Sequence, residues 1–124
     1  MAHTVEDVLC WWGRPEQWFG WSDLENKTYA NIVLEPRILR DGEWIDNPYT
    51  IPTESEVNAK IAEMNLDEVR QVRNQKLAET DWTRMDDNGL SDSAKASWAT
   101  YRQSLRDITN SATSLDDVTW PTKP

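Results

Sequence analysis

Apolar residues recur at helical spacing near the end of this 124-residue chain. Successive members of the stripe are four, three, four and three residues apart, which places their side chains on one face of an α-helix. The stripe consists of Ala94, Trp98, Tyr101, Leu105 and Ile108. Ser91 precedes it, where its hydroxyl can accept a hydrogen bond from the first helical turn. The pattern predicts a surface helix that begins after Ser91 and has one buried seam.

A second helix is predicted upstream. The sequence Thr53–Glu56 is a capping box, and apolar residues follow from Val57 at spacings of four and three. Asp67 is able to cap a separate segment, so the sequence leaves open whether one bent helix or two helices occupy residues 53–80. Asp, Asn and Gly are concentrated in residues 81–90, which predicts that the chain reverses there. The helical segments should therefore pack antiparallel, as a helical hairpin.

The first part of the chain is broken by seven Gly or Pro residues between Gly13 and Pro52, which leave no room for a long helix. β-Branched residues predict a short strand over Tyr29–Glu35. Asp41-Gly42 stands between two apolar pairs, which predicts a β-hairpin with a type I′ turn.

These segments predict an α+β protein with two domains. Residues 1–52 would form a small Trp-rich β-hairpin or meander part, and residues 53–124 the helical hairpin and an extended C-terminal tail. The tail is expected to be extended because Pro121 cannot continue a helix and biases Trp120 away from helical geometry.

Tryptophan is unusually frequent, with eight residues in the chain. Four of them and a phenylalanine fall within Cys10–Trp21 without a clear period. The rings either cover one face of the small sheet or form a contact surface for a partner or a glycan, because aromatic residues are enriched at interface cores. The candidate contact residues are Trp11, Trp12, Trp18, Phe19 and Trp21.

Charge and composition narrow the classes of partner. The net charge of −9 disfavours nucleic acid and anionic membranes as partners, because like charges repel. No apolar run is long enough to span a bilayer, and the N-terminus lacks the features of a signal peptide, so a soluble intracellular product is expected. The single cysteine, Cys10, excludes an internal disulfide framework.

Candidate catalytic and metal-binding residues are few. The one histidine is His3, and Cys10 has no other candidate base. The acidic pairs Asp86-Asp87 and Asp116-Asp117 lie in turn-rich stretches, where aspartates are usually solvated, and the first pair does not have EF-hand spacing. We therefore predict no catalytic residues, no metal and no cofactor, and expect a non-enzymatic protein that acts by recognition.

Sequence motifs from about Val57 onward resemble the tail assembly chaperone domain of tailed bacteriophages, and tail-fibre assembly proteins have a similar ending. The resemblance covers a little over half the chain and does not extend to residues 1–52. It rests on Arg73, Asn74, Asp81, Trp82, Thr83, Trp98, Tyr101, Leu105, Trp120 and Pro121.

The same positions have a physical interpretation. Trp82 can close the open end of the helix pair, and Trp120-Pro121 can fold back onto the hairpin as a lid. Arg102 and Arg106 are one turn apart, so they either stack on tryptophan or pair with nearby carboxylates such as Asp81, or else contact a partner.

The resemblance implies a helper that binds a phage tail or tail-fibre protein in the host cytoplasm during morphogenesis. The alternative is a permanent subunit of the virion tail, baseplate or fibre. A carbohydrate-binding module that uses Trp11, Trp12, Trp18 and Trp21 is a third hypothesis. The sequence specifies neither the partner's identity nor the oligomeric state.

Overall fold

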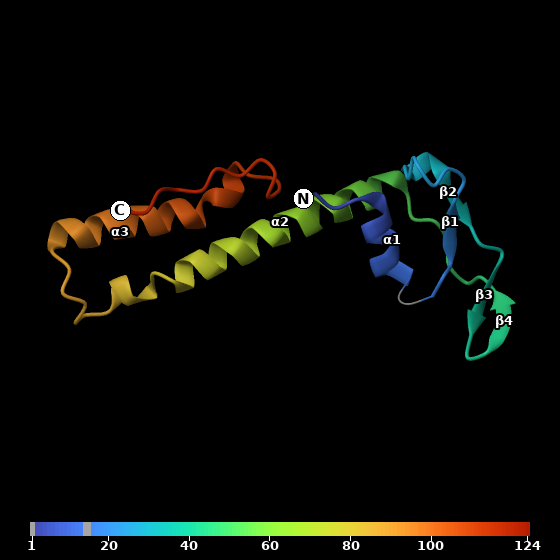
Figure 1. Cartoon of the computed structure of the whole chain (residues 1–124), viewed down its shortest axis with the longest axis horizontal. Coiled ribbons are helices and arrows are strands. Elements are labelled where there is room, and N and C mark those ends of the chain that lie inside the picture. The colour runs from blue at the N-terminus through green and yellow to red at the C-terminus, as the bar shows by residue number, and fades with distance from the viewer. Residues whose placement is uncertain (1, 14–15) are drawn as a thin grey trace. The chain divides into compact units, whose positions relative to one another are not determined.

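The computed structural model describes residues 2–13 and 16–124, so Pro15, one of the predicted helix breakers, lies outside the described residues. The chain forms two compact units, one from His3–Ile61 and the other mainly from Ala62–Pro124. Two small antiparallel sheets lie in the first part of the chain and the long helices follow, which confirms the predicted α+β class (Figure 1). A domain boundary at residue 53 stays a prediction.

The two sheets of the N-terminal unit each contain two strands. Strand β1 pairs with β2, and β3 pairs with β4. The strands are β1 (Phe19–Trp21), β2 (Ile32–Leu34), β3 (Arg37–Arg40) and β4 (Glu43–Asp46). The predicted hairpin is confirmed, because Asp41 and Gly42 connect β3 to β4 with φ values of 51° and 80°. The predicted strand over Tyr29–Glu35 is shorter than expected, since its first residues form a 3-10 helix, Tyr29–Asn31.

Helix α1 (Val5–Gly13) was not predicted from the sequence. Thr4 and Asp7 form a reciprocal cap at its start: the Asp7 N–H donates to the Thr4 hydroxyl, and the Thr4 N–H donates to the Asp7 carboxylate at 2.8 Å. The helix buries Val8 and Leu9. A nine-residue helix with this cap is compatible with the downstream glycine and proline residues, which exclude only longer helices.

The core of the N-terminal unit forms around Trp18, which is fully buried. The other buried residues of this core are Leu9 of α1, Phe19 of β1 and Ile38 of β3. The Trp18 indole N–H donates to the Leu9 carbonyl at 3.3 Å, so the buried polar group of this large ring has a partner. One tryptophan therefore joins α1 to both sheets.

Helix α2 (Glu54–Ala78) is a single helix of 25 residues, which answers the question the sequence left open. It begins as predicted, with the Glu56 N–H donating to the Thr53 hydroxyl at 3.1 Å. Asp67 does not cap a second segment; its carboxylate accepts from Arg70 one turn later, at 2.9 Å. No helix in the described ranges is both long and apolar enough to cross a membrane.

Helix α3 (Asp92–Arg106) begins at Ser91, whose hydroxyl accepts from the Ala94 N–H at 3.1 Å, as predicted. Between the helices, a 3-10 helix (Asp81–Arg84) and a turn with Gly89 at φ 72° reverse the chain. Within this unit α3 runs back along the C-terminal half of α2 (Figure 1). The predicted seam is confirmed over its C-terminal part, where Tyr101, Leu105 and Ile108 are buried.

The tail after α3 returns along the helical hairpin. A 3-10 helix, Ile108–Asn110, leads into a small cluster in which Val69 of α2, Ile108 and Ala112 are buried. Trp120 packs against this cluster, and the Lys76 ammonium lies 5.2 Å from the centre of its ring. The tail is therefore a lid on the helix pair, as its terminal Trp-Pro sequence predicted.

Candidate protein-interaction site

The β3–β4 hairpin has one buried and one exposed apolar face. Ile38 and Ile45 are cross-strand partners and pack into the core. Leu39 and Trp44 are the neighbouring cross-strand pair, and because side chains alternate along a strand they point to the opposite face. They are 54% and 62% exposed. The hairpin thus holds an apolar pair on its solvent-facing side, where polar residues are the usual choice.

A groove of about 720 Å³ lies beside this pair. Its volume is in the range of sites that hold a small ligand or a few side chains of a polypeptide. The residues of the groove used below are Glu16, Glu35, Arg37, Leu39, Arg40 and Trp44. We call these residues and the groove between them the hairpin groove.

A charged network supports one wall of the hairpin groove. Arg40 of β3 donates to both carboxylate oxygens of Glu16, at 2.6 and 2.9 Å, and the Tyr49 hydroxyl donates to the same carboxylate. These two donors, with Arg40 the stronger, lower the pKa of Glu16 to about 2. The carboxylate in turn raises the pKa of the Tyr49 hydroxyl. The network orders the chain before β1 against β3.

A second exposed aromatic group lies on α1. Trp11 and Trp12 are 41% and 40% exposed, and their rings meet edge to face with centroids 5.9 Å apart. The Lys60 ammonium lies 4.0 Å from the centre of the Trp11 ring. A role of Trp11 and Trp12 in binding a partner stays a prediction.

The other aromatic residues of the Trp-rich segment are placed differently. Trp18 and Phe19 belong to the core and are 0% and 6% exposed. These two rings therefore pack inside the N-terminal unit and do not form a surface for a partner. Trp21 is half-buried against Phe19, with ring centroids 5.7 Å apart. A surface platform that includes Trp18 is therefore contradicted, because its ring is used to pack α1 against both sheets.

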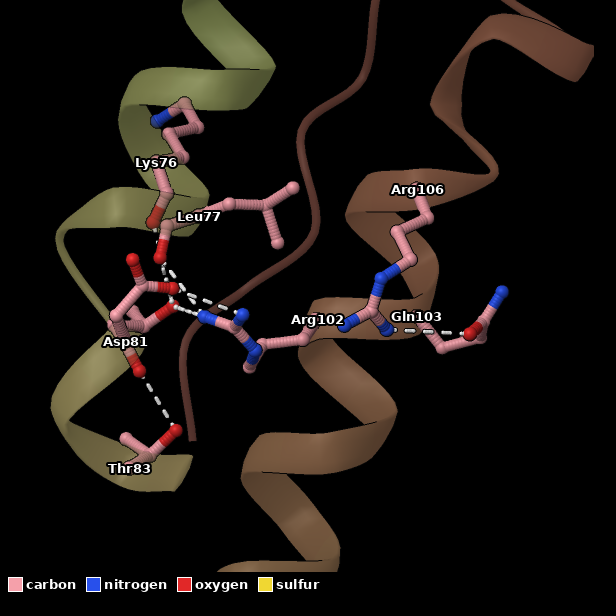
Figure 2. A network of polar contacts seen from close by, with 8 residues as sticks. Lys76, Leu77, Asp81, Thr83, Arg102, Gln103 and Arg106 are labelled. Atoms are coloured by element: carbon pink, nitrogen blue, oxygen red, sulfur yellow. Dashed lines mark hydrogen bonds and ion pairs between the residues drawn. The ribbon is translucent and has the colours of Figure 1, made fainter. Parts of the chain in front are cut away.

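Arg102 lies within the helical hairpin and is 8% exposed. Its guanidinium donates to the Leu77 carbonyl at 2.8 Å and to the Thr80 hydroxyl at 2.9 Å, and pairs with Asp81 at 3.0 Å. Figure 2 shows this side chain reaching the end of α2, whereas Arg106 contacts Gln103 on its own helix, at 3.3 Å. Arg102 was expected to stack on tryptophan, to pair with a carboxylate or to contact a partner, and the pairing with Asp81 is the one observed. Because the Arg102 side chain is buried, it is not part of an exposed contact surface.

The remaining family-motif residues have mainly structural contacts. Thr83 is buried and donates to the Thr80 carbonyl at 2.7 Å, and Arg73 donates to Asn74 at 2.9 Å. The Trp98 ring lies between those of Trp82 and Tyr101, at centroid distances of 5.7 and 5.8 Å. Leu105 is buried, and Trp120 and Pro121 are half-buried in the tail. Trp82 is 44% exposed, so it covers the end of the helix pair while one side remains open to solvent.

Three of the residues considered for chemistry, His3, Cys10 and Asp117, have local contacts within the fold. His3 pairs with Asp7 at 3.4 Å. Partial burial of the Cys10 thiol, together with the nearby carboxylates of Glu6 and Asp7, raises the pKa of this thiol. Hydrogen bonds from Thr113 and Ser114 lower the pKa of Asp117. Within residues 2–13 and 16–124, no three His, Cys, Asp or Glu side chains are grouped so that they could hold a metal ion.

Leu39 and Trp44 were not among the residues proposed from sequence as contact residues. The signal was present, because a two-residue turn at Asp41-Gly42 sets the cross-strand pairs and places adjacent apolar pairs on opposite faces. If the hairpin packs on a core with one face only, one apolar pair is buried and the other is exposed. The sequence does not show which pair is the exposed one.

Comparison with known protein families identifies a match in the second half of the chain. Residues 66–124 match the family model described as phage tail assembly chaperone protein. No significant match was found among curated protein sequences or solved structures. The match covers a little under half of the chain and starts later than the resemblance near Val57 suggested. The second half of α2, α3 and the tail therefore carry the sequence pattern of the phage tail assembly chaperone family, which confirms the predicted resemblance and supports a role in tail assembly.

Proposed function

We propose that this protein is a non-catalytic tail assembly chaperone that binds another tail polypeptide in the host cytoplasm during phage morphogenesis. The observation that carries the proposal is the match of residues 66–124 to the phage tail assembly chaperone family. A tail or tail-fibre protein is the class of partner that this family role requires.

Two features of the side chains support a binding role without chemistry. The Cys10 thiol has a raised pKa, which keeps it protonated and makes it a poor nucleophile. In contrast, large apolar side chains such as Trp44 are exposed, which is typical of protein-interaction surfaces.

The experiment is a capture from infected cells with the full-length tagged chain, followed by identification of the bound proteins by mass spectrometry. A tail or tail-fibre polypeptide should be enriched over a tag-only control. Purified virions should lack the chain, because a helper leaves after assembly. Recovery of the chain at stoichiometric levels in virions would instead favour the permanent tail, baseplate or fibre subunit.

A further inference from the structure

The exposed pair Leu39 and Trp44 is placed where it can anchor a partner. The two residues are directly opposite each other on β3 and β4, and side chains at such positions are close enough to interact. Tryptophan is enriched among the residues that dominate binding energy, and a rigid, pre-ordered aromatic loses little entropy on binding. The hairpin groove beside the pair provides space for an apolar side chain of the partner.

The charge of the N-terminal unit indicates the chemistry of that partner. Residues 3–61 contain eleven Asp or Glu against five Lys or Arg, so this unit carries −6 of the net charge of −9. A second copy of this chain has the same acidic surface and is disfavoured by repulsion. A partner segment with positive charge is attracted.

The charged groups of the hairpin groove are unequally satisfied. Arg40 is bound to Glu16, and Arg37 donates to the Trp44 carbonyl at 2.7 Å and lies 3.9 Å from Asp46. Among the residues that the structure describes, the Glu35 carboxylate has neither a hydrogen bond nor an ion pair, although it lines the groove. The cations are thus occupied, and a carboxylate beside the apolar pair is available to a cation of the partner.

We propose that the hairpin groove binds a basic segment of the tail polypeptide, in which a large apolar side chain packs on Leu39 and Trp44 while a neighbouring lysine or arginine pairs with Glu35. This inference rests on the proposed function, since it names the surface and the partner chemistry for the same binding event. It assigns the partner contact to the first half of the chain, outside the family match.

The test uses an array of overlapping 15-residue peptides that tile the tail proteins of the phage, probed with the labelled full-length chain. The bound peptides should have net positive charge and contain a large apolar residue. Trp44→Ser should weaken their binding by at least about tenfold, as expected for truncation of an interface anchor. Glu35→Gln should weaken it about two- to fivefold at low salt, with a smaller effect at high salt.

Two matched controls isolate the groove. Leu24 is 75% exposed and does not line the groove, so Leu24→Ser removes a similar exposed apolar side chain and should leave binding unchanged. Glu25→Gln removes the same charge as Glu35→Gln at an exposed position outside the groove. Far-UV circular dichroism of each variant checks that it is folded. The wild-type chain cross-linked with a carbodiimide, which joins carboxylates to lysine amines, should link Glu35 to the partner.

The results separate this proposal from the proposed function. If wild type and Trp44→Ser capture the same tail polypeptide equally from infected cells, the groove is not the site, although the chaperone function stands. Binding only to acidic or neutral peptides, or to none, also overturns the groove proposal. A dimer that Trp44→Ser converts to monomers would identify the face as a contact between copies. If wild type captures no tail polypeptide, the proposed function itself fails.

Discussion

The Arg102 guanidinium of α3 donates a hydrogen bond to the Leu77 carbonyl in the last turn of α2, at 2.8 Å. Carbonyls at a helix C-terminus lack intrahelical partners, and this end of the helix dipole favours a cation. The same side chain donates to the Thr80 hydroxyl and pairs with Asp81. One arginine of α3 therefore contacts both the C-terminal end of α2 and the connector that follows it. This explains why an arginine in the predicted seam region is buried.

Arg102→Ala should lower the free energy of unfolding by about 2–3 kcal/mol, because it removes two hydrogen bonds that a charged donor makes to the end of α2, one of them to the buried Thr80. Urea unfolding followed by circular dichroism measures this loss. Arg106→Ala is the matched control, since Arg106 is exposed and should change stability by less than about 0.5 kcal/mol. Equal losses in both variants would contradict the role of Arg102.

Asp81→Asn should have a much smaller effect than Arg102→Ala. The Asp81 side chain is 62% exposed, and ion pairs at such positions contribute about 0–1 kcal/mol. The hydrogen bonds of Arg102 to Leu77 and Thr80 remain in this variant. A loss as large as that of Arg102→Ala would show that the ion pair, and not the helix-end contact, holds the hairpin together.

Trp98→Ala should cost about 3 kcal/mol, the lower end of the range for truncating a core aromatic, because Trp98 is half-buried between Trp82 and Tyr101. Trp82→Ala should cost about 1 kcal/mol, mainly the lost ring pair, since Trp82 is 44% exposed. Thermal or urea unfolding of the two variants gives the comparison. A loss of less than about 1 kcal/mol on truncation of Trp98 would mean that this ring does not pack in the seam between the helices.

Glu16 makes the stability of the N-terminal unit sensitive to acid. Its pKa is lowered from 4.5 to about 2 by the Arg40 and Tyr49 hydrogen bonds. A lowered pKa in the folded state contributes stability that is present above the unfolded value and is lost as the pH falls from about 4.5 towards 2. Melting temperatures measured from pH 7 to pH 2 should therefore fall more steeply for wild type than for Glu16→Gln. Parallel curves would contradict the network.

Gly42→Ala should destabilise the β3–β4 hairpin by about 1–2 kcal/mol. Gly42 has φ of 80° and no atom lies within 4 Å of where a Cβ would be, so the cost comes from the left-handed backbone and not from a clash. Exchange of the β3 and β4 amide protons, measured by NMR, should become faster, while the α3 amides serve as the internal reference. Unchanged exchange would mean that the turn contributes little to the hairpin.

Local signals in the sequence were sufficient for much of the fold. The Thr53 and Ser91 caps, the Asp41-Gly42 turn and the stripe through Leu105 each involve residues within one turn or a few turns of each other. Such signals depend on local backbone geometry and on side chains that are close together in sequence, so they can be seen without knowledge of the tertiary packing. Helix α1 has a comparable cap at Thr4 and Asp7, but its apolar side chains are split between the core and solvent, which obscured the period.

Burial of individual rings could not be predicted in the same way. Trp12 and Trp18 occur in the same aromatic segment, yet one is 40% exposed and the other is fully buried. The difference arises from contacts with Ile38, which is distant in sequence. The exposure of Trp44 and the burial of Arg102 likewise depend on which face of a hairpin or helix meets another element, and this is set by tertiary packing.

A role in tail assembly can be tested by counting tailed particles, by electron microscopy, from infections in which the gene for this chain is deleted and then supplied in trans. Deletion should leave heads without complete tails, and the wild-type chain should restore tailed particles, while virions formed in this way should not contain it. Normal numbers of complete tails in the absence of the chain would contradict a role in tail assembly.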